Sequence, residues 1–236
     1  MADAEEITTQ DSTLEEWTRA LAEPIGSPGG GAGAGVMLAI AAALTSMVAG
    51  YTEPKEDLSG DPGEDRRVDQ RVTHQAELEA VIAGAQKLRS RALELADEDA
   101  TASAAFGKAF AMERGPERKK AIHEASLSAA RSSVILGEHA TGAIADLTWL
   151  AEHGNPALIA DVVVAFGALR AAVTGARTNA SFDLAALKSS GSSLEQVRQQ
   201  HPELWASVEA LDDAIARIDS ATQAVDDRAA PTDTQD

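Results

Sequence analysis

Residues 27–51 read SPGGGAGAGVMLAIAAALTSMVAGY, a glycine-rich loop that passes directly into an uncharged, alanine-rich stretch. The proline and the three consecutive glycines stop any preceding helix, and Ala, Leu, Val and Met favour a new one. A membrane-spanning helix needs about 20 strongly apolar residues. The apolar run at residues 33–51 is shorter, and Thr45 and Ser46 interrupt it. We therefore predict a helix that is buried on most of its circumference, and no membrane partner.

Residues 157–178 form a second stretch that is apolar on most sides, which predicts a second central helix. Elsewhere, apolar residues recur at spacings of three and four, the pattern of amphipathic helices. Only 3% of the residues are aromatic, and no segment alternates with period two. The sequence predicts an all-α, single-domain helical bundle, with two largely buried central helices surrounded by amphipathic ones. The amphipathic helices are expected at residues 14–23, 68–112, 116–153 and 202–225.

Charge and composition limit the partners of this chain. We expect one domain over residues 13–226, between a disordered acidic N-terminus (1–12) and a disordered acidic tail (227–236). The formal charge of −18 argues against nucleic acid and against an anionic membrane surface. The absence of cysteine excludes disulfides and Cys-based zinc sites, and we expect a cytoplasmic protein. The five histidines show no zinc-binding spacing, so no metal is predicted.

The loop Pro28-Gly29-Gly30-Gly31 is the clearest local motif. Glycine lets a ligand approach the backbone, and the start of the following helix attracts an anionic or carbonyl oxygen. The loop lacks the lysine of a P-loop and the spacing of a dinucleotide fingerprint. Glycines also allow close packing of helices, so the spacing alone favours neither a binding site nor a packing role.

Two acidic positions are candidates for acid–base chemistry. Asp99 ends the run Asp97-Glu98-Asp99 among Ala and Ser, surroundings that can raise the pKa of a carboxyl group. Asp161 interrupts an otherwise apolar helix, and Asn179 follows it on the same segment. A solvated acidic turn for the first, and an acid stabilised in the first helical turn for the second, are the alternative interpretations.

Several segments, in order, resemble the cyclodeaminase/cyclohydrolase family that acts on folate one-carbon adducts. They are the glycine loop at 28–32, MVAGYT at 47–52, DEDA at 97–100, GNPALIAD at 154–161, and Asn179. The family includes the C-terminal domain of formiminotransferase-cyclodeaminase and stand-alone methenyltetrahydrofolate cyclohydrolases. The resemblance implies an all-helical homodimer that binds a folate in a cleft near the glycine loop and the subunit interface.

From this resemblance, the expected activity is hydrolysis of 5,10-methenyltetrahydrofolate to 10-formyltetrahydrofolate, with formimidoyltetrahydrofolate cyclodeaminase as the alternative. Asp99 and Asp161 are the catalytic candidates, and Pro28, Gly29–Gly31 and Asn179 the substrate-binding ones. No cofactor is implied beyond the folate substrate itself. Ala32 and Ser103 depart from the family pattern, as does the acidic loop at 53–65. These departures keep open a third interpretation, a diverged, non-catalytic folate-binding or helical interaction protein.

Overall fold

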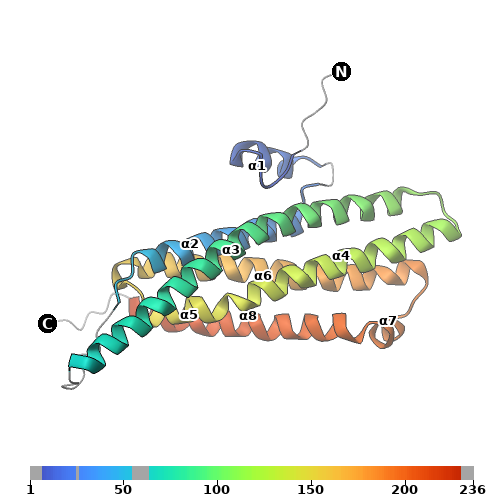
Figure 1. The fold of residues 1–236 in the computed structure, drawn as a ribbon. Helices are drawn as coiled ribbons and strands as arrows, with labels where there is room; N and C mark the ends of the chain where they lie inside the picture. Colours follow the sequence, from blue (N-terminus) through green and yellow to red (C-terminus); the bar gives the residue numbers. More distant parts are fainter. Residues whose placement is uncertain (1–6, 25–26, 55–63, 230–236) are drawn as a thin grey trace.

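The computed structural model describes residues 7–24, 27–54 and 64–229 of the chain. Every regular element in these ranges is helical, and the long helices lie lengthwise in an elongated bundle (Figure 1). The predicted all-α helical bundle is therefore confirmed. The helices are α1 (Leu14–Ala22), α2 (Gly30–Gly50), α3 (Glu64–Ala111), α4 (Pro116–Gly142), α5 (Ile144–His153), α6 (Ile159–Ala186), α7 (Leu194–Gln200) and α8 (Pro202–Ala229), with the 3₁₀ turns η1 (Pro156–Leu158) and η2 (Leu187–Ser190).

The two apolar helices predicted from the sequence, α2 and α6, pack against each other at the centre of the structure. Helix α2 also packs against α3, and α6 packs against α4 and α8. Small residues let the helix axes come close. A Cβ atom on Gly35 would lie 2.7 Å from the Cβ of Ala96 in α3, and one on Gly175 would lie 2.8 Å from the Cβ of Ala34. Glycine is therefore required at both contacts.

Hydrogen bonds near one end of the bundle join the end of α2 to the turn before α6. The Asn155 side chain accepts from the N–H of Ala157 and so begins η1, as the Asn-Pro sequence predicts. It also donates to the carbonyl of Tyr51, and the N–H of Asn155 donates to Thr52 Oγ1 at 3.0 Å. This junction makes α6 antiparallel to α2, so the last turns of α6 lie near the first turn of α2.

Some boundaries differ from the sequence prediction. The single helix expected at 116–153 is divided at Ala143 into α4 and α5. The short helix α7 was not predicted, although Ser193 and Gln196 form the S-x-x-Q capping box that begins it. Residues 7–12, expected to be disordered, form a turn in which the N–H of Thr9 donates to Asp97 Oδ1 of α3 at 2.6 Å. Residues 1–6, 55–63 and 230–236 lie outside the described residues.

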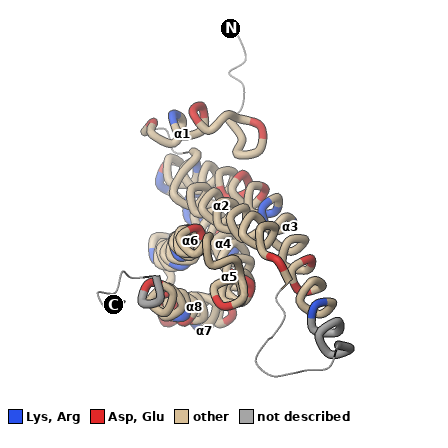
Figure 2. Tube along the Cα trace, turned by 90° about the vertical axis from the view of Figure 1, so that its left-hand side faces the viewer, with Lys and Arg blue, Asp and Glu red and all other residues tan. Residues whose placement is uncertain are grey.

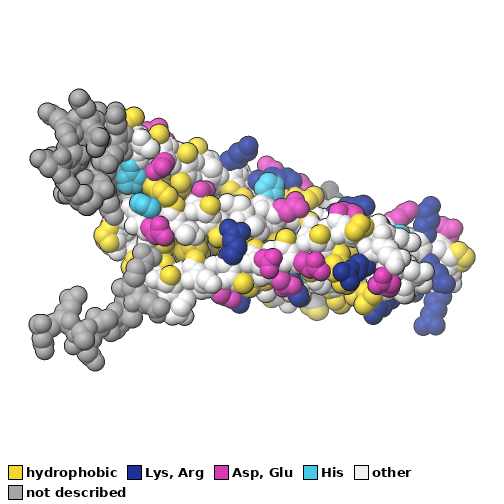
Figure 3. Space-filling view, turned by 90° about the horizontal axis from the view of Figure 1, so that it is seen from below, with side chains coloured by type: hydrophobic (Ala, Val, Ile, Leu, Met, Phe, Trp, Pro, Cys, Tyr) yellow, Lys and Arg dark blue, Asp and Glu magenta, His cyan; other side chains and the backbone are white. Residues whose placement is uncertain are grey.

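Helices α2 and α6 each have one side that no other helix of the described residues covers. Charged residues of α6 on the opposite side pair with α8, Arg170 with Asp219 and Arg177 with Asp212. Figure 3 shows that face, over α8, with acidic and basic side chains interspersed. In contrast, α2 has no charged residue at all (Figure 2).

Two helical segments, Gly30–Gly50 and Pro156–Ser189, are long and apolar enough to span a membrane. The core helices of proteins without a membrane also meet this criterion. The buried share of the most apolar window is 56% in the first segment and 33% in the second.

We expect Gly35→Ala to lower stability by about 1–3 kcal/mol, because the added methyl group overpacks the α2–α3 contact. Gly84→Ala in the interior of α3 is the matched control, because its Cβ would meet only one atom, at 3.9 Å. Removing a flexible glycine from a helix there should raise stability by about 0.5–1 kcal/mol. Urea unfolding followed by circular dichroism measures both changes. A Gly35→Ala variant as stable as Gly84→Ala would contradict the close contact.

Candidate functional site

A pocket of about 320 Å³ lies at the end of the bundle where α2 begins. Four helices build it: the first turn of α2, the last third of α3, the middle of α4 and the end of α6. On α3 and α6, every lining residue lies three or four positions from another one, which places them on one face of each helix. The lining residues are Gly30, Gly31, Asp99, Ser103, Phe106, Gly107, Ser133, Asn179, Phe182 and Asp183.

The glycine loop supports a buried carboxylate. A Cβ atom on Gly31 would overlap the carboxylate of Asp99, so only glycine allows this acid to approach the start of α2. The N–H of Ala32 donates to that carboxylate, and Ser103 Oγ donates to Asp99 Oδ2 at 3.4 Å. A helix N-terminus stabilises a negative charge through its free N–H groups and its dipole. Gly30 has no neighbour within 4 Å of its would-be Cβ and leaves its backbone open.

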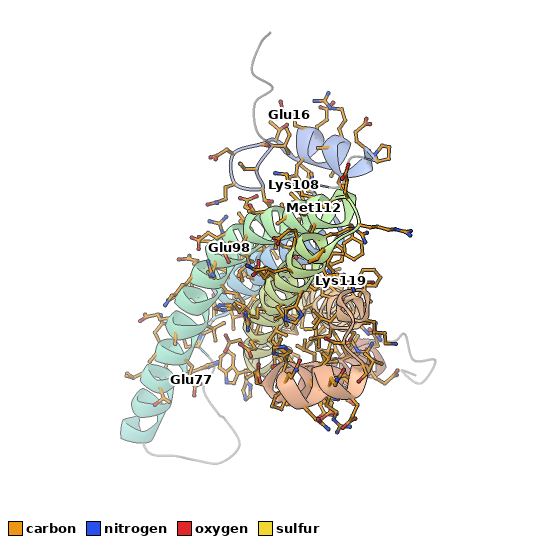
Figure 4. The ribbon with its side chains drawn as sticks, turned by 90° about the vertical axis from the view of Figure 1, so that its right-hand side faces the viewer. Glu16, Glu77, Glu98, Lys108, Met112 and Lys119 are labelled. Carbon is orange, nitrogen blue, oxygen red and sulfur yellow. The ribbon has the colours of Figure 1, made fainter. Side chains whose placement is uncertain are left out.

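The three consecutive acids of α3 point in three directions. Asp97 accepts hydrogen bonds from the N-terminal turn, at Thr9 and Gln10. Glu98 pairs with Arg91 at 2.8 Å on the outer surface of α3 (Figure 4). Asp99 alone is buried, with 5% of its surface exposed. Of the two interpretations that the sequence left open, the solvated acidic turn fits Glu98, whereas Asp99 lies in the pocket.

A second acid, Asp183 of α6, enters the same pocket, and the sequence analysis missed it. Asp183 is 8% exposed and makes no hydrogen bond within the described residues. Burial, and secondarily the negative charge of Asp99, raises the pKa of Asp183 to about 7. Burial also raises the pKa of Asp99, and its two hydrogen bonds oppose that rise. Asp183 follows Asn179 by four residues, a spacing that already indicated a shared helix face.

Two phenylalanine rings border the pocket and were also missed. Phe106 of α3 and Phe182 of α6 lie with ring centroids 6.5 Å apart, and Phe110 packs against Phe106 at 4.7 Å. Three of the four phenylalanines in the chain are therefore grouped here. Phe182 is 65% exposed, an unusual position for a large apolar ring. Such rings offer flat faces on which an aromatic ligand can stack.

The comparisons with known proteins agree with this architecture. The family model described as formiminotransferase-cyclodeaminase matches residues 13–201, about four fifths of the chain. The chain belongs to the formiminotransferase-cyclodeaminase family. Its fold is also similar to the crystal structure of formiminotetrahydrofolate cyclodeaminase from Thermotoga maritima, with a TM-score of 0.67 and 24% identity, over 92% of this chain and 95% of that one. No match was found among curated proteins.

The family segments lie at opposite ends of the bundle. Gly30, Gly31, Asp99 and Asn179 are brought together in the pocket. Gly29 is the N-cap residue of α2, and Pro28 is buried just before it, and neither of them lines the pocket. The segment at 154–161 instead contacts the end of α2, through the hydrogen bonds of Asn155.

Asp161 does not line the pocket. It is half-buried in the first turn of α6, 18 residues before Asn179, which is about 27 Å along a helix. This position corresponds to the alternative interpretation, an acid stabilised by the helix dipole. Its predicted catalytic role stays a prediction. No group of three or more metal-binding side chains converges within the described ranges.

The raised pKa of Asp183 predicts a pH-dependent stability. Its pKa of about 7 in the folded chain exceeds its ordinary value of 3.8, so protonation stabilises the fold, and that stability is lost as the pH rises through 7. We expect Asp183→Asn to melt several degrees above the wild type at pH 8, and the difference to vanish near pH 4. Melting curves followed by circular dichroism at both pH values test this.

Asp219→Asn is the control of opposite sign. The hydrogen bonds from Arg170 lower the pKa of Asp219, so this substitution should not stabilise the protein at pH 8. A difference between Asp183→Asn and the wild type that is independent of pH would contradict the proton linkage.

Proposed function

We propose that this protein is a formimidoyltetrahydrofolate cyclodeaminase, which joins the formimidoyl carbon on N5 to N10 and releases ammonia. The family match and the named activity of the Thermotoga maritima protein support this reaction over the hydrolysis that the sequence first suggested. The observation that carries the proposal is the pair of buried acids, Asp99 and Asp183, in one pocket bordered by aromatic rings.

The charge of the pocket suits the substrate. A protonated formimidoyl group on nitrogen is an amidinium cation, and the product has a methenyl bridge that is also cationic. The pocket lining contains two carboxyl groups and no Lys or Arg. A buried carboxylate that lacks a cationic partner binds such a group more strongly than a neutral one, because the surrounding dielectric is low.

The size and shape of the pocket suit one end of a folate. A volume of about 320 Å³ is at the lower limit for small-molecule sites, enough for a bicyclic ring with its one-carbon group. Phe106 and Phe182 would stack on the flat ring system, with Asn179 available for hydrogen bonds to its polar edge. The rest of the substrate would extend past the exposed ring of Phe182. The reaction needs no cofactor beyond this substrate.

The assay supplies 5-formimidoyltetrahydrofolate and measures both the ammonia released and the absorbance of the methenyl product. We expect turnover by the wild type and a loss of about 100-fold or more in Asp99→Asn, because an amide cannot accept a proton. Glu98→Gln, its solvent-facing neighbour, is the matched control and should stay within about threefold of the wild type.

The same protein sample distinguishes the cyclodeaminase from the two alternatives, a cyclohydrolase and a non-catalytic binder. Methenyltetrahydrofolate offered alone should decay no faster than in buffer, and rapid decay without cyclodeaminase turnover would establish the cyclohydrolase instead. A rise in melting temperature with folate but no turnover would establish a non-catalytic binder.

We also propose that the protein is a homodimer whose subunits meet through the outer face of α2 and α6. This face carries large exposed apolar side chains, Met37 and Ile40 at 40% and Val164 at 58%. Helices α2 and α6 pack side by side, and α2 has no charge, so their exposed strips form a largely apolar surface. Exposed apolar surface of this kind is typical of protein–protein contacts.

Val164→Lys should convert the dimer to a monomer, because it places a charge in that apolar face. Val72→Lys is the control, since Val72 is 63% exposed on α3, outside α2 and α6. Light scattering should give about twice the chain mass of 24.5 kDa for the wild type and for Val72→Lys, and the single-chain mass for Val164→Lys. A monomeric wild type at micromolar concentration would refute the dimer.

A further inference from the structure

We propose that Asp183 is a second catalytic residue, the acid that donates a proton to the departing ammonia while Asp99 accepts the proton lost by N10. This inference rests on the proposed cyclodeaminase function. It assigns a catalytic role to a residue of α6, outside both the glycine loop and the run of acids on α3. It follows from the position of two carboxyl groups, on different helices, in one cavity.

Asp183 has the surroundings of a reactive group rather than of a structural one. It is more than nine-tenths buried, lines the pocket, and makes no hydrogen bond within the described residues. Among the residues lining the cavity, α2 contributes only Gly30 and Gly31, and α4 contributes the hydroxyl of Ser133. The only other titratable group there is Asp99 of α3. A buried acid with no cationic partner destabilises a fold when it ionises, so a structural acid at this position would have a partner.

The two acids differ in a way that assigns their roles. Asp99 accepts hydrogen bonds from the N–H of Ala32, in the first turn of α2, and from Ser103 of its own helix α3, and these stabilise its ionised form. Asp183 lacks such donors, and burial together with the charge of Asp99 raises its pKa to about 7. As the pH falls below about 7, the first proton that the pair takes up therefore resides mainly on Asp183. The base and the acid of the reaction are then present together.

The proton balance of the reaction matches such a pair. Attack of N10 on the amidinium carbon forms the N10–C bond and leaves N10 with a proton to lose, which passes to the carboxylate of Asp99. The amino group on the same carbon takes a proton from Asp183, and the C–N bond breaks to give ammonia and the methenyl cation. Asp99 therefore gains one proton and Asp183 loses one, so the number of protons on the two acids is unchanged. The protonated formimidoyl group of the substrate and the methenyl bridge of the product each carry a charge of +1, so charge is conserved.

The test compares wild type, Asp183→Asn and Asp219→Asn in the ammonia-release assay, over a pH range of about 5.5 to 9. In the wild type, kcat should fall as the pH rises through about 7, because Asp183 must carry its proton. Asp183→Asn should lose about 100-fold or more in kcat, with KM changed no more than a few-fold, and should lack that alkaline fall. Asp219 is on α8, where it pairs with Arg170, and it does not line the pocket, so Asp219→Asn should match the kcat and the pH profile of the wild type.

A second measurement excludes a folding defect and a merely structural role. Asp183→Asn must keep the helical circular dichroism of the wild type. In Asp183→Ala, a small acid such as imidazolium should restore part of the lost kcat in proportion to its concentration. An active Asp183→Asn with the pH profile of the wild type would overturn the role of Asp183 alone. An inactive wild type would overturn the cyclodeaminase function and this role together.

Discussion

The burial of one carboxylate against the start of α2 is the constraint on which the rest of the site depends. Asp99 can occupy its place only because Gly31 has no side chain, and it stays there because Ala32 donates a backbone N–H to it. Asp99 reaches this position because α3 packs closely against α2, and that close packing is possible because Gly35 of α2 has no side chain where it contacts Ala96 of α3. The glycine-rich sequence therefore has both roles that its spacing allowed, close packing at one glycine and access for a polar group at another.

The two buried carboxyl groups lower the stability of the fold and place negative charge in one pocket. Burial raises the pKa of both acids, and the charge of Asp99 further raises that of Asp183, so the fold is less stable above neutral pH than it would be with neutral groups. Sites under such strain are commonly functional, because selection for folding alone would remove them. The membership of the chain in a family of enzymes is consistent with this interpretation.

Much of the fold could be predicted from the sequence, because hydrophobic period and helix caps are local signals. The two apolar helices and the cap at Asn155 follow from neighbours along the chain, whereas for Asp99 the local sequence left open both a buried and a solvated position. Asp183 could not be found in this way, because its partner is 84 residues earlier, on another helix. Asp161 was selected because it interrupts an apolar helix, but periodicity within one helix does not show which end of it meets the glycine loop.

The acid pair alone does not determine which reaction of the proposed class takes place. A base and an acid at these positions would serve attack by water as well as attack by N10, so selectivity depends on what reaches the carbon. N10 belongs to the same molecule as that carbon, and holding the folate in the right geometry gives N10 a large effective concentration. The rings of Phe106 and Phe182 border the cavity, and a folate stacked on them would exclude water from the same space. In the proposed deaminase, therefore, the aromatic border favours ring closure over hydrolysis, and the acids supply the proton transfer that either reaction needs.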